Sequence, residues 1–281
     1  MRKLAIGVAL SGALALTGLT APLASAATTS PDLVFSDVTV NLGKGIVVGT
    51  TATVEVPVTY TLTRPSDLVI DYKTTFAGVL LYRGKLSDMA NGLDPDSAPA
   101  CATMATTDTT VTEACTETIT VDPQDSLYAA ADATTWTAGG FYSHIEQDSD
   151  DSDGHISFGS GYDIWGNLGT LQIKRAAKLT ADATPEPVVK GKTLTVKGKL
   201  TRANWSTGTY TGYQDQSVKL QFRPAGSTTY TTVKTVTSGT GGALSTTVKA
   251  TKSGYFRYQF AGTATTGAKT STGDYVKVNA G

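Results

Sequence analysis

The stretch VEVPVTYTL, residues 54–62, places a hydrophobic side chain at every second position. Successive side chains of a β-strand point to opposite faces, so this alternation predicts a strand with one buried face and one solvent face. Apolar runs at residues 68–70 and 79–82, and a second alternating stretch at residues 116–121, extend the same pattern. The first part of the chain is therefore expected to consist of β-strands.

The last hundred residues alternate more regularly. Hydrophobic and polar side chains take turns in several stretches that Gly, Ser or Pro separates: residues 194–200, 218–222, 256–260 and 276–278. About seven strands in about 105 residues is the size of an immunoglobulin-like β-sandwich. Pro185 and Pro187 restrict the backbone before this region, which predicts a stiff connector or a kinked first strand. The predicted fold class is all-β, with two consecutive immunoglobulin-like β-sandwich domains.

The N-terminus has the three parts of an export signal. Residues 1–3 are basic, an apolar run follows to Leu19, and residues 24–26, Ala-Ser-Ala, supply the small side chains that signal peptidase needs. Cleavage after Ala26 predicts three segments: a signal peptide at 1–26, an acidic β-sandwich domain at 27–176 and a basic one at 177–281. The alternative is an N-terminal anchor helix that stays uncleaved. No later stretch approaches the roughly 20 apolar residues of a membrane-spanning helix, so we expect a secreted, extracellular protein.

The chain contains two cysteines, Cys101 and Cys115. An even pair in an exported protein is typical of a disulfide. A bond that closes a loop of about 15 residues would stabilise the fold by roughly 3 kcal/mol in the chain-entropy model. A metal site is the weaker alternative, because the sequence has no CxxC pair and both histidines lie far away along the chain.

The net charge of −1 conceals a strong asymmetry. Residues 27–178, the acidic half, contain 20 Asp and Glu against 8 Lys and Arg, and residues 179–281, the basic half, contain 4 against 13. Fields from such charges extend about 8–10 Å in physiological salt. The asymmetry predicts self-association through opposite charges, or binding of the basic half to an anionic cell-wall polymer, for example one that bears phosphates. Charges that are merely solvated are the alternative. The basic half lacks the recognition helix, Arg-rich tract and stacking motif of a nucleic-acid partner.

Four carboxylates crowd one short segment just before Gly154: Asp148, Asp150, Asp151 and Asp153. Calcium takes roughly six to eight oxygen ligands, and clustered Asp with Ser and main-chain carbonyls can supply them. The segment matches a helix-loop-helix calcium loop poorly, because Ser149 and Ser160 stand where carboxylates belong. Its flanks indicate strands, so calcium is predicted as a cofactor at a hairpin tip, with a solvated acidic turn as the alternative.

Three aromatic residues, Trp205, Tyr210 and Tyr213, lie in one predicted loop at residues 203–215. Exposed rings on a sandwich loop can stack on sugars, which makes a carbohydrate-binding module one interpretation. The other interpretation is that the loop folds back and uses these rings to cover the end of the core.

Motifs for catalysis are missing from the sequence. It contains two histidines, His144 and His155, and no G-x-S-x-G, H-E-x-x-H or P-loop motif. Four adjacent carboxylates on a turn would also stay too hydrated to work as a tuned acid and base. No catalytic residue is predicted, and an unrecognised extracellular hydrolase remains a further alternative.

Three stretches of the basic half resemble β-sandwich repeats of secreted actinobacterial proteins: KGKTLTVKG at residues 190–198, QSVKLQFRPAG at 216–226 and GYFRYQFAG at 254–262. The resemblance covers residues 177–279, and such proteins are often labelled calcium-binding or immunoglobulin-like without a defined activity. It implies a fold and a compartment, and it carries no catalytic residues over. Together these observations predict a secreted, non-catalytic binding or structural protein at the cell exterior.

Overall fold

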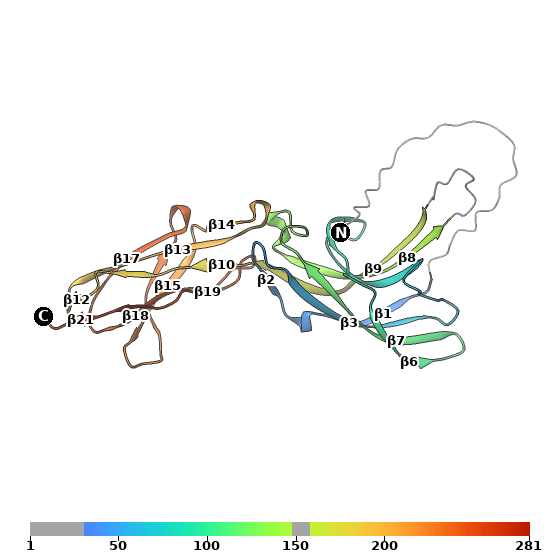
Figure 1. Ribbon diagram of the computed structural model, residues 1–281, viewed down its shortest axis with the longest axis horizontal. Helices are drawn as coiled ribbons and strands as arrows, with labels where there is room; N and C mark the ends of the chain where they lie inside the picture. The colour runs from blue at the N-terminus through green and yellow to red at the C-terminus, as the bar shows by residue number, and fades with distance from the viewer. Residues whose placement is uncertain (1–30, 148–157) are drawn as a thin grey trace, which may run out of the picture. The chain divides into compact units, whose positions relative to one another are not determined.

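The computed structural model describes residues 31–147 and 158–281, which are built almost entirely from β-strands and tight turns (Figure 1). The predicted fold class, all-β with immunoglobulin-like sandwich architecture, is confirmed. The helical segments of the described residues are single 3-10 turns: η1 (Asn41–Gly43), η2 (Ala130–Asp132), η3 (Trp205–Thr207) and η4 (Thr240–Gly242). The predicted signal peptide at 1–26 and the acidic segment at 148–153 lie outside the described residues.

Two sheets enclose the first core. One has the order β1 (Val34–Val40), β3 (Val54–Pro65), β7 (Thr110–Val121) and β6 (Ala100–Thr106). The other has the order β2 (Ile46–Val48), β9 (Phe158–Arg175), β8 (Thr135–Gln147), β4 (Thr75–Lys85) and β5 (Asp88–Leu93). All of these neighbours are antiparallel except β2 and β9, which run parallel.

The alternation in residues 54–62 places its hydrophobic side chains in this first core. Val56, Val58 and Leu62 of β3 are fully buried, and they belong to the same hydrophobic cluster as Val79 of β4 and Trp136 of β8. Burial of each large side chain contributes about 1.5–3 kcal/mol, so this face holds the two sheets together.

The basic half also contains two sheets. In one of them, β13 (Thr193–Asn204) pairs with four short strands: β10 (Ala177–Leu179), β11 (Asp182–Thr184), β14 (Thr209–Gly212) and β17 (Ala243–Lys249). In the other, β16 (Thr231–Thr237), β15 (Ser217–Pro224), β18 (Gly254–Phe260) and β19 (Lys269–Thr270) lie side by side, and β20 (Asp274–Val276) also pairs with β18. A short parallel pair, β12 (Val188–Val189) and β21 (Val278–Asn279), completes the strands.

A second core fills the space between these two sheets. Leu194 and Val196 of β13 cluster with Val218 and Leu220 of β15, and all four side chains are buried. Tyr258 of β18 is fully buried, and its hydroxyl donates a 2.8 Å hydrogen bond to the carbonyl oxygen of Val196. The phenol therefore finds the partner that a buried polar group needs.

The chain passes from one core to the other at the end of β9. There the N–H of Arg175 donates to the carbonyl of Thr265 at 3.0 Å, and the carbonyl of Arg175 accepts from the N–H of Gly267 at 2.9 Å. The domain limits 27–176 and 177–281 stay a prediction. Within the described residues, no helix is long and apolar enough to cross a membrane.

Candidate functional site

The predicted disulfide between Cys101 and Cys115 is confirmed. The two residues lie directly opposite each other on β6 and β7, with Cα atoms 4.1 Å apart. All seven residues of β6 are exposed, so this edge strand buries no apolar side chain that would hold it in place. The disulfide supplies that attachment, and it is the covalent chemistry of oxidising compartments.

The rings of the loop at 203–215 do not form an exposed platform. Trp205 is only 4 % exposed, belongs to the first core, and donates from Nε1 to the carbonyl of Gly49 at 2.8 Å. The guanidinium of Arg175 lies 5.4 Å from the centre of its ring. The indole thus fills a buried gap, which leaves no free face for a sugar.

The two tyrosines of that loop are also covered by cations of the chain itself. The ammonium of Lys178 lies 3.9 Å from the ring centre of Tyr210, and the guanidinium of Arg202 lies 4.1 Å from that of Tyr213. Cations over ring faces gain attraction from the π-system. These contacts favour the other sequence interpretation, in which the loop covers the end of the core.

The predicted calcium ligands Asp148, Asp150, Asp151 and Asp153 lie outside the described residues, and calcium binding stays a prediction. In residues 31–147 and 158–281, no three His, Cys, Asp or Glu side chains are grouped so that they could hold a metal ion.

A different surface gathers chemically distinctive side chains: the outward face of the sheet that contains β15 and β18. Val218, Leu220 and Phe222 point toward the second core, so the residues between them point outward: Lys219, Gln221 and Arg223. The same alternation in β18 turns the residues between its buried aromatics outward: Tyr255, Arg257 and Gln259. Five of the residues on this side are tyrosines and arginines, here named the tyrosine–arginine face: Arg223, Tyr230, Tyr255, Arg257 and Tyr275.

Stacking orders the tyrosine–arginine face. The guanidinium of Arg223 lies 4.1 Å from the ring centre of Tyr255 and 5.3 Å from that of Tyr230. The guanidinium of Arg257 lies 3.6 Å from the ring centre of Tyr230, and the rings of Tyr255 and Tyr275 are 5.1 Å apart. These contacts hold long, flexible side chains in one arrangement before any partner arrives.

Hydrogen bonds extend the order along the strands. Arg257 donates from Nε to Oε1 of Gln221 at 2.8 Å, and Gln221 donates from Nε2 to Oε1 of Gln259 at 2.9 Å. Arg223 donates from Nη1 to the carbonyl of Ser227. Each guanidinium carries five N–H donors. Both arginines therefore keep donors that are not used by the described residues.

Gly273 makes room for this arrangement. A Cβ atom at this position would lie 2.3 Å from the hydroxyl oxygen of Tyr230. A contact of that length is far inside van der Waals separation, so any larger residue would displace the tyrosine from Arg257. In the sequence this glycine directly follows a threonine-rich stretch at residues 263–272, where it would be interpreted as an ordinary turn residue.

The tyrosine–arginine face is positively charged. The ion pairs of the described residues join Arg64 to Glu113 and Arg83 to Asp132, so neither Arg223 nor Arg257 is neutralised in this way. Three of the four carboxylates of the basic half, Asp182, Glu186 and Asp274, lie together, and Asp274 precedes Tyr275 in β20. Burial, followed by the neighbouring Asp274 and Asp182, raises the pKa of Glu186, and Asp274 accepts a hydrogen bond from the N–H of Ala183 at 2.7 Å.

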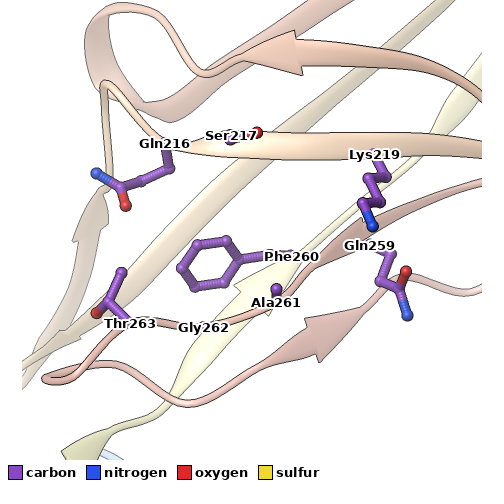
Figure 2. Close-up of a pocket in the computed structure, with 8 residues that line it drawn as sticks. All are labelled: Gln216, Ser217, Lys219, Gln259, Phe260, Ala261, Gly262 and Thr263. Atoms are coloured by element: carbon purple, nitrogen blue, oxygen red, sulfur yellow. The ribbon is translucent and has the colours of Figure 1, made fainter.

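A small cavity of about 290 Å³ adjoins this surface at the Lys219 end. Figure 2 shows Lys219 and Gln259 on neighbouring strands at one side of it, with the ring of Phe260 between them and Thr263. None of the eight residues that line it is acidic. The face therefore ends at a recess whose lining contains one cation, Lys219, and no carboxylate.

Sequence reasoning missed the tyrosine–arginine face, although a signal was present. The stretch YFRYQF at 255–260 alternates buried aromatics with outward Tyr, Arg and Gln. The outward residues of one strand say little by themselves, because a single Arg or Tyr on a solvent face is common. The register of β15 against β18 places Arg223 opposite Tyr255, and this pairing shows that the outward residues of the two strands form one cluster.

The fold and the disulfide define the class of the chain: an immunoglobulin-like β-sandwich protein with the cross-linking chemistry of non-cytoplasmic proteins. No protein-family model and no curated protein matches its sequence. Among solved structures it is similar to a Corynebacterium diphtheriae protein described as membrane anchored, with a TM-score of 0.30, 12 % identity and coverage of 89 % of this chain and 59 % of that one. It is also similar to the full ectodomain (Ig1–Ig3) of mouse nectin-like molecule 4, with a TM-score of 0.23, 13 % identity and coverage of 88 % and 64 %. The chain thus spans under two thirds of the length of either structure.

Proposed function

We propose that the chain is a secreted, non-catalytic binding protein of the cell exterior, and that its tyrosine–arginine face docks an anionic partner. The observation that carries the proposal is the ordered stack of Arg223 and Arg257 with tyrosine rings, on a face without ion-paired carboxylates. Calcium binding by the predicted segment at 148–153 is a separate part of the proposal, tested below.

The composition of the face supports a role in binding. Tyrosine and arginine are enriched at interfaces and among the residues that dominate binding energy. Such side chains add large contact area at a low entropic cost when they are already held in place. Arg223 and Arg257 meet this condition, because Arg223 is held by two rings, Arg257 by one, and each by one hydrogen bond.

The charge of the basic half supports an anionic partner. Its +9 balance raises the local concentration of anions near the surface, and such attraction weakens as salt screens it. An anionic polymer at the cell surface, or the acidic half of another copy, has the complementary charge.

Retention on isolated actinobacterial cell walls tests the proposal. Full-length protein is mixed with the walls at rising salt, and the bound fraction is compared with that of an R223Q/R257Q variant. We expect the variant to elute at markedly lower salt. The matched control is K192Q/K249Q, which removes the same charge from exposed lysines beside β13 and at the end of β17. Equal loss in both variants would refute a role for the tyrosine–arginine face.

A further inference from the structure

The cations of the outward face follow one another along two neighbouring strands. In the antiparallel pairing of β15 with β18, three successive outward pairs of opposite residues are Lys219–Gln259, Gln221–Arg257 and Arg223–Tyr255. Each pair contributes one cation. Successive outward positions are two residues apart, which is about 6.6–6.8 Å along a strand. The three cations alternate between β15 and β18, so their backbone positions form a zigzag that advances about 7 Å along the strands at each step.

A repeat of about 7 Å selects among anions. Three backbone bonds of a fully extended chain span about 3.3–3.6 Å, so six bonds span about 7 Å. Six bonds separate successive phosphorus atoms when a three-carbon polyol links phosphates through its end oxygens. Such a polymer advances by the same length at each phosphate, so the long Lys and Arg side chains can each reach one phosphate, whereas isolated anions would gain nothing from the spacing.

An extended acidic peptide has a similar repeat between every second side chain, but the face suits it less well. Peptides that bind sheets usually add to an edge, where main-chain N–H and C=O groups are free. Here the main chains of β15 and β18 pair with each other over seven residues, from Val218–Phe260 to Pro224–Gly254. The face offers side-chain donors alone, which match a polymer whose polar groups are phosphates and hydroxyls.

The donors match phosphate chemistry. Arginine recognises phosphate through its planar fork of N–H groups, and lysine binds it as a point charge. Arg223 and Arg257 each use one donor inside the chain, and Lys219 is exposed beside the cavity. Tyr275 is exposed next to this row and supplies a ring face and a hydroxyl for the polyol.

We infer that Lys219, Arg257 and Arg223 bind three successive phosphates of a linear polyol-phosphate polymer. The inference rests on the proposed function and names the chemistry of its anionic partner. The polyol-phosphate polymer is thus the single ligand that we infer for this surface. Binding of an acidic polypeptide in its place is one of the results that the experiment below can give.

Calorimetric titration of the full-length protein with synthetic oligo(glycerol phosphate) of one to six phosphates tests the inference. We expect affinity to rise up to three phosphates and then to level off. K219Q, R223Q and R257Q should each weaken binding of the six-phosphate probe about tenfold, the loss of one charged hydrogen bond. The triple variant should lower the slope of log affinity against log salt by about 2. R223K and R257K keep the charge but lose the stack, so they should fall between wild type and the Gln variants.

The control is K192Q/K199Q/K249Q, which removes three exposed lysines. Lys192 lies just before β13, Lys199 lies within β13, and Lys249 ends β17. It should change affinity less than twofold, and circular dichroism melting checks that every variant folds. Equal or tighter binding of hexaglutamate would assign the face to acidic polypeptides and overturn the inference. If R223Q/R257Q lowers retention on cell walls while oligo(glycerol phosphate) does not bind, the proposed function stands and the phosphate inference fails.

Discussion

Glu117 lies where a carboxylate is least expected, inside the first core. It is 7 % exposed, although it belongs to β7 between buried hydrophobic residues. Its Oε1 accepts a 2.8 Å hydrogen bond from the N–H of Val79, and its Oε2 accepts one from the hydroxyl of Tyr60 at 3.4 Å. β5 pairs only with residues 81–85 of β4, so Val79 lies beyond its end and takes the carboxylate as a partner.

Burial raises the pKa of Glu117 from an ordinary value of 4.5 to about 7, and the two hydrogen bonds offset part of this effect. The folded protein therefore holds a proton between pH 4.5 and 7 that the unfolded chain has released. Because the folded state binds more protons there, the free energy of unfolding contributed by this group falls as pH rises. Each pKa unit corresponds to about 1.4 kcal/mol, so the full loss is about 3 kcal/mol.

Glu117→Gln removes this titration and keeps the shape and an acceptor for Val79. We expect the stability of the variant relative to wild type to improve by about 3 kcal/mol between pH 4 and pH 8. Urea unfolding of both proteins at pH 4, 6 and 8, with the disulfide intact, measures the difference. Comparison at each pH cancels the titration of all other groups.

Glu55→Gln, on the exposed face of β3, is the matched control. Its free energy of unfolding relative to wild type should vary by less than about 0.5 kcal/mol between pH 4 and pH 8. A difference in the free energy of unfolding between Glu117→Gln and wild type that does not change between pH 4 and pH 8 would refute the reasoning. Such a result would mean that Glu117 is hydrated or paired well enough to keep its ordinary pKa in the folded protein.

Four further predictions concern the disulfide, Trp205, the tyrosine–arginine face and the acidic segment. The double variant C101S/C115S should lose about 3 kcal/mol in urea unfolding, because β6 buries no side chain and the bond closes a 14-residue separation; a loss below about 1 kcal/mol would contradict this role. Trp205→Ala should lower the free energy of unfolding by about 3–5 kcal/mol, since the indole is buried in the first core and its N–H is bonded to Gly49. A glycan array should show no signal that is present with wild-type protein and lost with Trp205→Ala. Gly273→Ala should displace Tyr230 and lower retention on cell walls with little change in melting temperature, whereas unchanged retention would show that the position of Tyr230 is unimportant. Millimolar calcium should raise the melting temperature over that in chelator, because a ligand that binds only the folded state stabilises it; the shift should vanish in D150A/D151A, and no shift in the wild-type protein would end the calcium prediction.

Much of the fold could be predicted from local pattern. Period-two alternation in residues 54–62 and 194–200 becomes β3 and β13, and the buried side chains are those that the pattern assigns to the inner face. The disulfide could be predicted because the chain has only two cysteines and a signal for export. These features depend on neighbours within a few residues or on simple counting, so no knowledge of tertiary structure is needed.

The site required the tertiary structure. Trp205 was predicted as either a sugar platform or a cover for the core, and its bond to Gly49, 156 positions away along the chain, favours the cover. Arg223 and Tyr255 are separated by 32 positions, and they stack only because the register of β15 and β18 sets them opposite each other.

The sequence by itself determined that this chain forms strands, which of their faces are buried, which cysteines join and how charge divides between its halves. Tertiary structure alone decided which outward side chains become neighbours, which ring is covered and why a carboxylate lies in the core. The physical reason is the separation along the chain of the residues that interact. Alternation and turns are set by each residue and its chain neighbours, whereas strand register is set by the packing of whole sheets, and a shift of one residue would turn Arg223 and Arg257 from solvent toward the core.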